Sequence, residues 1–174
     1  RLASLTPEDA RSIINYKGFL PVWTNEPVDL TSLYMERIAK LPVSGYGIYA
    51  KYYAFVLSSD GIMPVAHPDP QRLFQLPGYE RERSLIIQNT LALIEGTGAN
   101  NVLLYGDAGT GKSSTVKAIL NEYKNKGLRL IEIKKDQLLE LPSLLEMLSI
   151  NPLKFILFID DLSFSGNDDS FSAL

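Results

Sequence analysis

Residues 101–114 read NVLLYGDAGTGKSS, and they give the clearest indication of the fold class. Its first five residues are apolar enough to form a buried strand, and the glycines that follow permit a tight turn. A helical pattern then runs from Ser113 to Asn125 and is closed by Gly127. The stretch therefore predicts a strand at 101–105, a glycine-rich turn and a helix in direct succession.

The turn matches the pattern G-x-x-x-x-G-K-[ST] at every fixed position. Its residues are Gly106, Asp107, Ala108, Gly109, Thr110, Gly111, Lys112 and Ser113, followed by Ser114. In this arrangement backbone N–H groups point at phosphate oxygens, and the positive end of the following helix favours an anion. We expect Lys112 to contact the β- and γ-phosphates of a nucleotide and Ser113 to ligate Mg²⁺. The alternative is a plain tight turn, which would not require Gly-Lys-Ser in that order.

Further strands and helices alternate along the second half of the chain. We predict helices at 80–94 and 138–150 and short apolar strands at 128–133 and 154–159. Strands that are apolar on both faces and alternate with helices are typical of a parallel sheet covered by helices. The expected fold class is therefore α/β, a parallel sheet with flanking helices that is truncated after its third strand.

Two carboxylates follow the last of these strands. Because the carboxyl ends of parallel strands share one edge of a sheet, Asp160 should lie near the glycine-rich turn and help to hold Mg²⁺. Two roles remain open for Asp161. It could orient a water molecule for attack on the γ-phosphate. Alternatively, it could cap a turn or hydrogen-bond to the ligands of the metal without touching the metal itself.

The first 70 residues predict a small α+β unit. A turn at 58–61 separates aromatic and β-branched runs, so we expect a hairpin of 48–57 with 62–66. His67-Pro68-Asp69-Pro70 predicts a stiff linker. We therefore divide the chain into an N-terminal unit with its linker, residues 1–70, and the N-terminal part of a nucleotide-binding domain, residues 71–174.

Composition excludes several classes of protein. The 174 residues include no Cys and one His, which argues against disulfides, iron–sulfur clusters and Cys-ligated zinc. With 17 Lys and Arg against 20 Asp and Glu, the net charge of -3 does not favour nucleic acid as a partner. A local basic patch that binds nucleic acid is still compatible with this charge. No apolar run is long enough to span a membrane and no signal peptide is evident, so we expect a cytoplasmic protein without a membrane partner.

The motifs together resemble the AAA+ division of P-loop NTPases. The glycine-rich turn is similar to a Walker A loop and the strand ending at Asp160 to a Walker B strand, with one strand between them. A closer resemblance is to the bacterial family of uncharacterised AAA+-like ATP-binding proteins, domain-of-unknown-function family eight hundred and fifteen. It covers the chain from about residue 45 and rests on these segments: His67–Pro70, Gly78–Glu80, Ala99–Gly106, Gly109–Ser114 and Asp160–Phe164.

The resemblance implies ATP and Mg²⁺ as cofactors and a homo-oligomer for the full-length protein. Leu76–Glu80 resembles the AAA+ segment whose backbone contacts adenine, which assigns Gly78 and Tyr79 to the nucleotide. Lys112 and Asp161 would be the catalytic residues of ATP hydrolysis. The helical lid, the sensor residues and the arginine finger of AAA+ proteins have no counterpart here, and Arg1 in place of Met predicts a fragment. Hydrolysis is therefore expected of the longer protein.

Three alternatives to an ATPase motor stay open. ATP could order a partner-binding surface with negligible turnover, as in a nucleotide-regulated binding module. The phosphate could instead pass to an acceptor, as in a kinase. A helicase loader is a further AAA+ subtype. The sequence names neither the protein partner nor the preference for ATP over GTP, beyond the lack of an Asn-Lys-x-Asp guanine signature.

Overall fold

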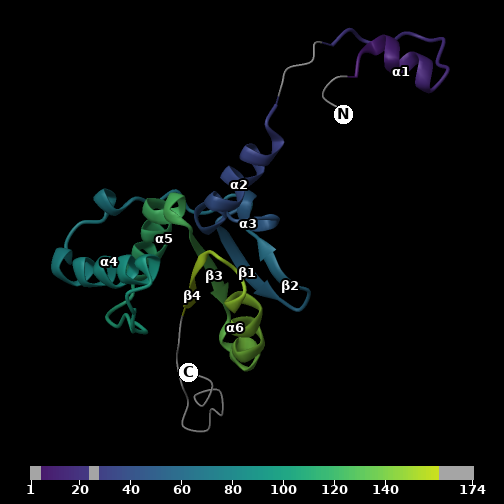
Figure 1. Cartoon of the computed structure of the whole chain (residues 1–174). Helices are drawn as coiled ribbons and strands as arrows, with labels where there is room; N and C mark the ends of the chain where they lie inside the picture. Colours follow the sequence, from purple (N-terminus) through teal and green to yellow (C-terminus); the bar gives the residue numbers. More distant parts are fainter. Residues whose placement is uncertain (1–4, 24–27, 161–174) are drawn as a thin grey trace. The chain divides into compact units, whose positions relative to one another are not determined.

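The computed structural model describes residues 5–23 and 28–160 (Figure 1). The chain divides into two compact units, Arg1–Ala39 and Lys40–Leu174. In the first unit, helix α1 (Pro7–Ile13) begins at a capping box in which Thr6 and Asp9 exchange hydrogen bonds. Helix α2 (Leu30–Ser44) begins in the first unit and ends in the second. Asp161 lies outside the described residues.

A four-stranded, mostly parallel sheet forms the centre of the second unit (Figure 1). The strands are β1 (Ala54–Ser58), β2 (Gly61–Pro64), β3 (Leu128–Ile133) and β4 (Lys154–Ile159), in the order β2-β1-β3-β4. β3 is parallel to both β1 and β4, and β2 returns antiparallel to β1. The prediction of a mixed α/β fold with a largely parallel sheet is thus confirmed, and β3 and β4 have the predicted bounds.

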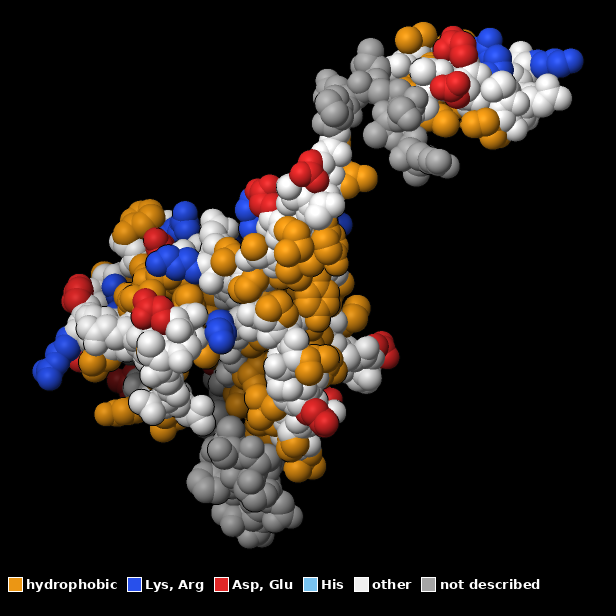
Figure 2. All heavy atoms as spheres, in the orientation of Figure 1, with side chains coloured by type: hydrophobic (Ala, Val, Ile, Leu, Met, Phe, Trp, Pro, Cys, Tyr) orange, Lys and Arg blue, Asp and Glu red, His pale blue; other side chains and the backbone are white. Residues whose placement is uncertain are grey.

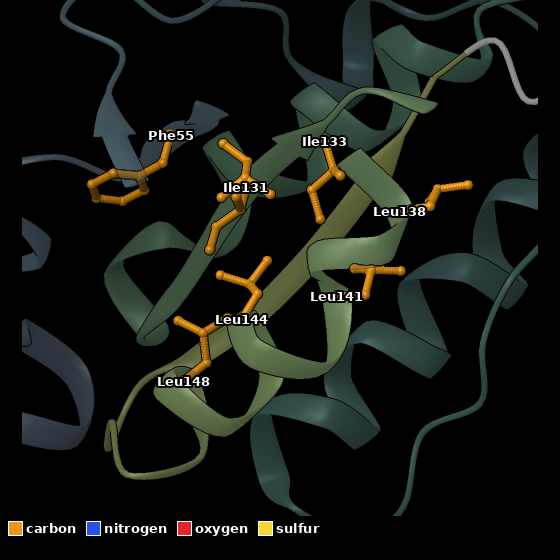
Figure 3. Close-up of a cluster of buried hydrophobic side chains, with 8 residues drawn as sticks. Phe55, Ile131, Ile133, Leu138, Leu141, Leu144 and Leu148 are labelled. Atoms are coloured by element: carbon orange, nitrogen blue, oxygen red, sulfur yellow. The ribbon is translucent and has the colours of Figure 1, made fainter. Parts of the chain in front are cut away.

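Helices cover both faces of the sheet. On one face, the side chains of Phe55, Ile131 and Ile133 pack against helix α6 (Leu141–Ser149), whose Leu144 is only 2% exposed (Figure 3). The 3-10 helix η4 (Lys135–Glu140) leads into α6. On the other face, helix α5 (Lys112–Tyr123) packs Val116 and Leu120 against Ala54 and Leu130. The neighbouring residues Leu130 and Ile131 of β3 therefore face opposite layers of the core, which explains why both faces of the strand carry apolar side chains there.

The expected strand at 101–105 is wrong, because the segment has no strand conformation. Val102, Leu103 and Tyr105 are 50, 75 and 89% exposed, and only Leu104 packs against the cluster that includes Leu130 and Leu120. An apolar run becomes a strand only where a neighbouring strand pairs with its backbone, and none of the described strands does so.

The expected hairpin is correct in its turn and wrong at its start. Residues 48–51 form a short helix, α3 (Ile48–Lys51), and the strand begins only at Ala54. The ring of Tyr49 lies 5.0 Å from that of Phe55 and 5.4 Å from that of Phe155, measured between centroids. The aromatic residues are thus used in packing, and the hairpin itself extends the main sheet through the pairing of β1 with β3.

Arg129 is a buried cation within β3, with 3% of its surface exposed. Nε donates to the carbonyl of Tyr49 at 2.9 Å, Nη1 to those of Lys124 and Leu128 at 3.0 and 2.8 Å, and Nη2 to that of Ser44 at 3.2 Å. Burial lowers the pKa of Arg129 from its ordinary value. The guanidinium thus joins β3 to the end of α2, to α3 and to the end of α5, where helix carbonyls carry partial negative charge.

Candidate functional site

The glycine-rich loop, Gly106–Ser113, joins the exposed 101–105 segment to helix α5. Gly106, Gly109 and Gly111 have φ angles of 138°, 79° and 82°, which side chains with a Cβ rarely adopt. Gly111 is the N-cap of α5 and offers no side chain to the first helical N–H groups. The end of the helix that attracts anions is therefore left without a capping side chain.

Lys112 folds back over this loop. Its Nζ donates hydrogen bonds of 2.8 Å to the carbonyls of Gly106 and Asp107. The hydroxyl of Thr110 donates to the carbonyl of Asp107, also at 2.8 Å. The ammonium group thus lies against the loop backbone, and Asp107, Ala108 and the rest of 106–109 are exposed. A ligand that reaches the loop would meet this positive charge.

Ser113 and Asp160 come together from opposite parts of the sequence. The Ser113 hydroxyl lies 2.8 Å from Oδ2 and 3.0 Å from Oδ1 of Asp160. Asp160 directly follows β4, and Ser113 is the second residue of α5, so the packing of α5 on the sheet brings the two side chains to one edge. A hydroxyl beside a carboxylate is a pair of hard oxygen donors, the kind that Mg²⁺ prefers.

The other sequence-predicted residues are more dispersed. Ser114 is half-buried in the first turn of α5. Gly78 and Tyr79 lie at the start of helix α4 (Glu80–Glu95), where their hydrogen bonds run to Arg83 rather than to the loop. Within residues 5–23 and 28–160, no group of three or more Asp, Glu, His or Cys side chains gathers to hold a metal ion. A metal here would need oxygens from its ligand as well as from Ser113 and Asp160.

Polar contacts that were not predicted from the sequence hold residues 67–72 on α5; this stretch, the predicted linker 67–70 with the two residues after it, is called the linker 67–72 below. Asn121 is 7% exposed, and its side-chain amide donates to the carbonyls of Asp69 and Gln71 at 2.7 and 2.9 Å. The sequence does contain a signal for these contacts, because Asn121 follows apolar residues in a helix that is expected to be packed. Asn has low helix propensity, and a buried Asn amide needs hydrogen-bond partners.

Two surface properties bear on possible partners. On the face in Figure 2, Lys and Arg side chains are spread among Asp and Glu side chains and do not gather into one basic patch. Among the helices formed by residues 5–23 and 28–160, none combines the length and the apolar character needed to cross a bilayer.

The fold and the loop describe an α/β protein with a mostly parallel sheet and a glycine-rich turn before a helix on that sheet. The family model described as "Protein of unknown function (DUF815)" matches residues 50–174, and the chain belongs to this family. The matched residues include β1, the glycine-rich loop and Asp160. Neither the curated proteins nor the solved structures contain a match to the chain.

Proposed function

We propose that the protein binds Mg-ATP at the glycine-rich loop. We further propose that the full-length protein is an AAA+-like P-loop ATPase, in which hydrolysis drives a conformational change in a homo-oligomer. The observation that carries the proposal is the Ser113–Asp160 contact, 2.8 Å at its shortest, beside the uncapped start of α5. A helix end of the kind that attracts phosphate and a pair of hard oxygen atoms thus lie close together, which supports the proposal.

Lys112 supplies the positive charge for the phosphates. Its ammonium now binds two neutral carbonyls, those of Gly106 and Asp107. Phosphate oxygens carry negative charge and accept stronger hydrogen bonds, so a triphosphate can replace these internal contacts with a gain in energy. The glycines allow the loop backbone to turn its N–H groups toward the same ligand.

Ser113 and Asp160 are the residues that would hold Mg²⁺. One hydroxyl and one carboxylate are few ligands for an all-protein metal site, but they suit Mg²⁺, which usually retains waters and takes phosphate oxygens as further ligands. When bound, Mg²⁺ would neutralise charge on the β- and γ-phosphates. The chain's own contribution is to keep these two oxygens together at the end of β4.

Two further roles rest on the family resemblance. Asp161 directly follows Asp160, and we assign to it the orientation of the attacking water. Gly78 and Tyr79 are assigned to the base of the nucleotide. Tyr79 is 58% exposed, and an exposed aromatic ring can stack on a base.

Titration calorimetry with Mg-ATP tests the proposal, with the wild-type protein compared with Lys112→Ala. We expect the variant to bind at least about tenfold more weakly, because charge-assisted contacts to phosphate are worth about 1.5–3 kcal/mol. Lys117→Ala is the matched control, since Lys117 lies in the same helix and outside the loop. Equal affinities for wild type and Lys112→Ala, or no binding of Mg-ATP by the full-length protein, would refute the proposed site.

Turnover is a separate measurement. Steady-state phosphate release by the full-length protein should fall strongly in Asp161→Asn, whereas Mg-ATP affinity should change little. Tight binding without phosphate release in the wild type would instead identify a nucleotide-regulated binding module. Transfer of labelled phosphate to an acceptor would identify a kinase.

A further inference from the structure

A cavity of about 220 Å³ lies beside α5, outside the glycine-rich loop. Its buried lining is apolar and includes Ala54 of β1, Leu120 of α5 and Leu130 of β3, which pack together in the core. Pockets that hold drug-sized ligands are larger, roughly 300–1,000 Å³. The cavity is therefore of a size for a metabolite smaller than a nucleotide.

Side chains of both charges line the same cavity. Lys117 comes from α5, Glu132 from the end of β3, and His67 and Asp69 from the linker 67–72. Within residues 5–23 and 28–160, the side chains of Lys117 and Glu132 form no hydrogen bond or ion pair, either with each other or with another residue. Two opposite charges thus line one cavity without neutralising each other.

The linker side of the cavity is held in place from α5. Asn121 is 7% exposed, and its amide donates to the carbonyls of Asp69 and Gln71 at 2.7 and 2.9 Å. In return, Nη1 of Arg72 donates to the backbone carbonyl of Asn121 at 3.1 Å. Oδ1 of Asp69 also accepts the backbone N–H of Gln71, at 3.0 Å. This side of the cavity is therefore preformed, and a ligand would not need to order it.

We propose that the cavity binds a small zwitterion with an apolar body, of the class of the apolar α-amino acids. A ligand with only a positive charge would be repelled by Lys117, and one with only a negative charge would be repelled by Glu132 and Asp69. A molecule with both charges can direct its carboxylate to Lys117 and its ammonium to Glu132, through charge-assisted hydrogen bonds. Its apolar body would lie on the buried lining.

This site goes beyond the proposed function and does not depend on it. None of the residues that line the cavity belongs to the glycine-rich loop or to the Ser113–Asp160 pair. The zwitterion is therefore a second ligand of the protein and not a part of the nucleotide.

Calorimetry on the full-length protein with three probes of similar shape tests the proposal. The probes are L-leucine, its decarboxylated analogue isoamylamine and its deaminated analogue isocaproate. We expect L-leucine to bind at least about tenfold more tightly than either analogue, because each analogue loses one charge-assisted contact and leaves one charge of the cavity unpaired. Binding of L-leucine no tighter than that of an analogue, or no binding of L-leucine, would overturn the proposal.

Two substitutions separate the two contacts. Lys117→Met should weaken L-leucine binding about fivefold to tenfold and should not weaken isoamylamine binding, because only the contact to the carboxylate is lost. Glu132→Gln should weaken L-leucine binding by a similar factor and should not weaken isocaproate binding. The matched controls are Lys126→Met and Glu95→Gln, which remove the same charges at exposed positions outside the cavity and should leave all three affinities unchanged.

The variants also separate a charge contact from a change of shape. Equal loss of L-leucine and isoamylamine in Lys117→Met, together with equal loss of L-leucine and isocaproate in Glu132→Gln, would overturn the assignment of the two charges. Lys112→Ala, which alters only the loop, should retain its affinity for L-leucine. A wild type that binds L-leucine and not Mg-ATP would support this site and refute the proposed function, and the opposite result would refute this site alone.

Discussion

Replacement of Arg129 by Met should remove about 3 kcal/mol of unfolding free energy. The guanidinium makes four hydrogen bonds, to the carbonyls of Ser44, Tyr49, Lys124 and Leu128. At about 1.5–3 kcal/mol for each bond to a charged group, the gross loss is roughly 6–12 kcal/mol. The buried charge of Arg129 also carries a desolvation cost of several kcal/mol, which the Met variant does not have, and the Met side chain fills most of the space. The net loss of unfolding free energy is therefore smaller than the gross loss.

Urea unfolding monitored by circular dichroism measures this difference, with Arg81→Met on the exposed surface of α4 as the control. The control should lie within about 0.5 kcal/mol of the wild type, as is usual for surface positions. The Arg129 variant should also lose about 10 °C in Tm, given a few degrees per kcal/mol for a domain of this size. If the Arg129 variant lost less than about 1 kcal/mol of unfolding free energy, the four carbonyls would be hydrogen-bonded to water instead. Our account of Arg129 as a link between helix ends would then be wrong.

Three further outcomes follow from the described contacts. Leu144→Ala should cost about 2–5 kcal/mol in the same unfolding assay, because Leu144 is 2% exposed in the core beneath α6 and its loss leaves a cavity. Hydrogen bonds from the backbone and hydroxyl of Thr6 lower the pKa of Asp9 from its ordinary value of 3.8. The ionised carboxylate therefore stabilises α1 fully at a pH above the ordinary pKa, and this stabilisation is lost as the pH falls through the lowered pKa. NMR titration of α1 would detect the loss. Asp160→Asn should raise the Mg²⁺ concentration needed for ATP binding and leave metal-free binding nearly unchanged, because the carboxylate beside Ser113 is lost but the loop is not.

Local pattern predicted the parts of the fold that are decided locally. The strands at 128–133 and 154–159 have the predicted bounds, and the 80–94 helix extends by one residue, because each is long or apolar enough to be recognised alone. Asp160 lies beside Ser113 as expected, but not because two parallel strands end there: residues 101–105 form no strand, and the packing of α5 on the sheet brings the two side chains together. The role of Asp160 as a metal ligand stays a prediction.

Features that depend on distant partners could not be predicted in the same way. Residues 101–105 are as apolar as a strand, but strand structure needs hydrogen bonds from a neighbour, and no periodicity reveals whether that neighbour is present. Arg129 gives a related difficulty, because its acceptors are carbonyls up to 85 residues away in sequence. Backbone carbonyls are carried by every residue type, so sequence pattern does not show which of them a buried cation will find.

Helix α5 explains why the site and the linker should respond to each other. Its first turn carries Lys112 and Ser113, its middle packs through Val116 on the sheet, and its last turn holds the linker through Asn121. An α-helix with packed side chains transmits displacement as a nearly rigid body, because its backbone hydrogen bonds fix the spacing of its residues. Helix α5 thus connects the glycine-rich loop at its start with the linker contacts at its end.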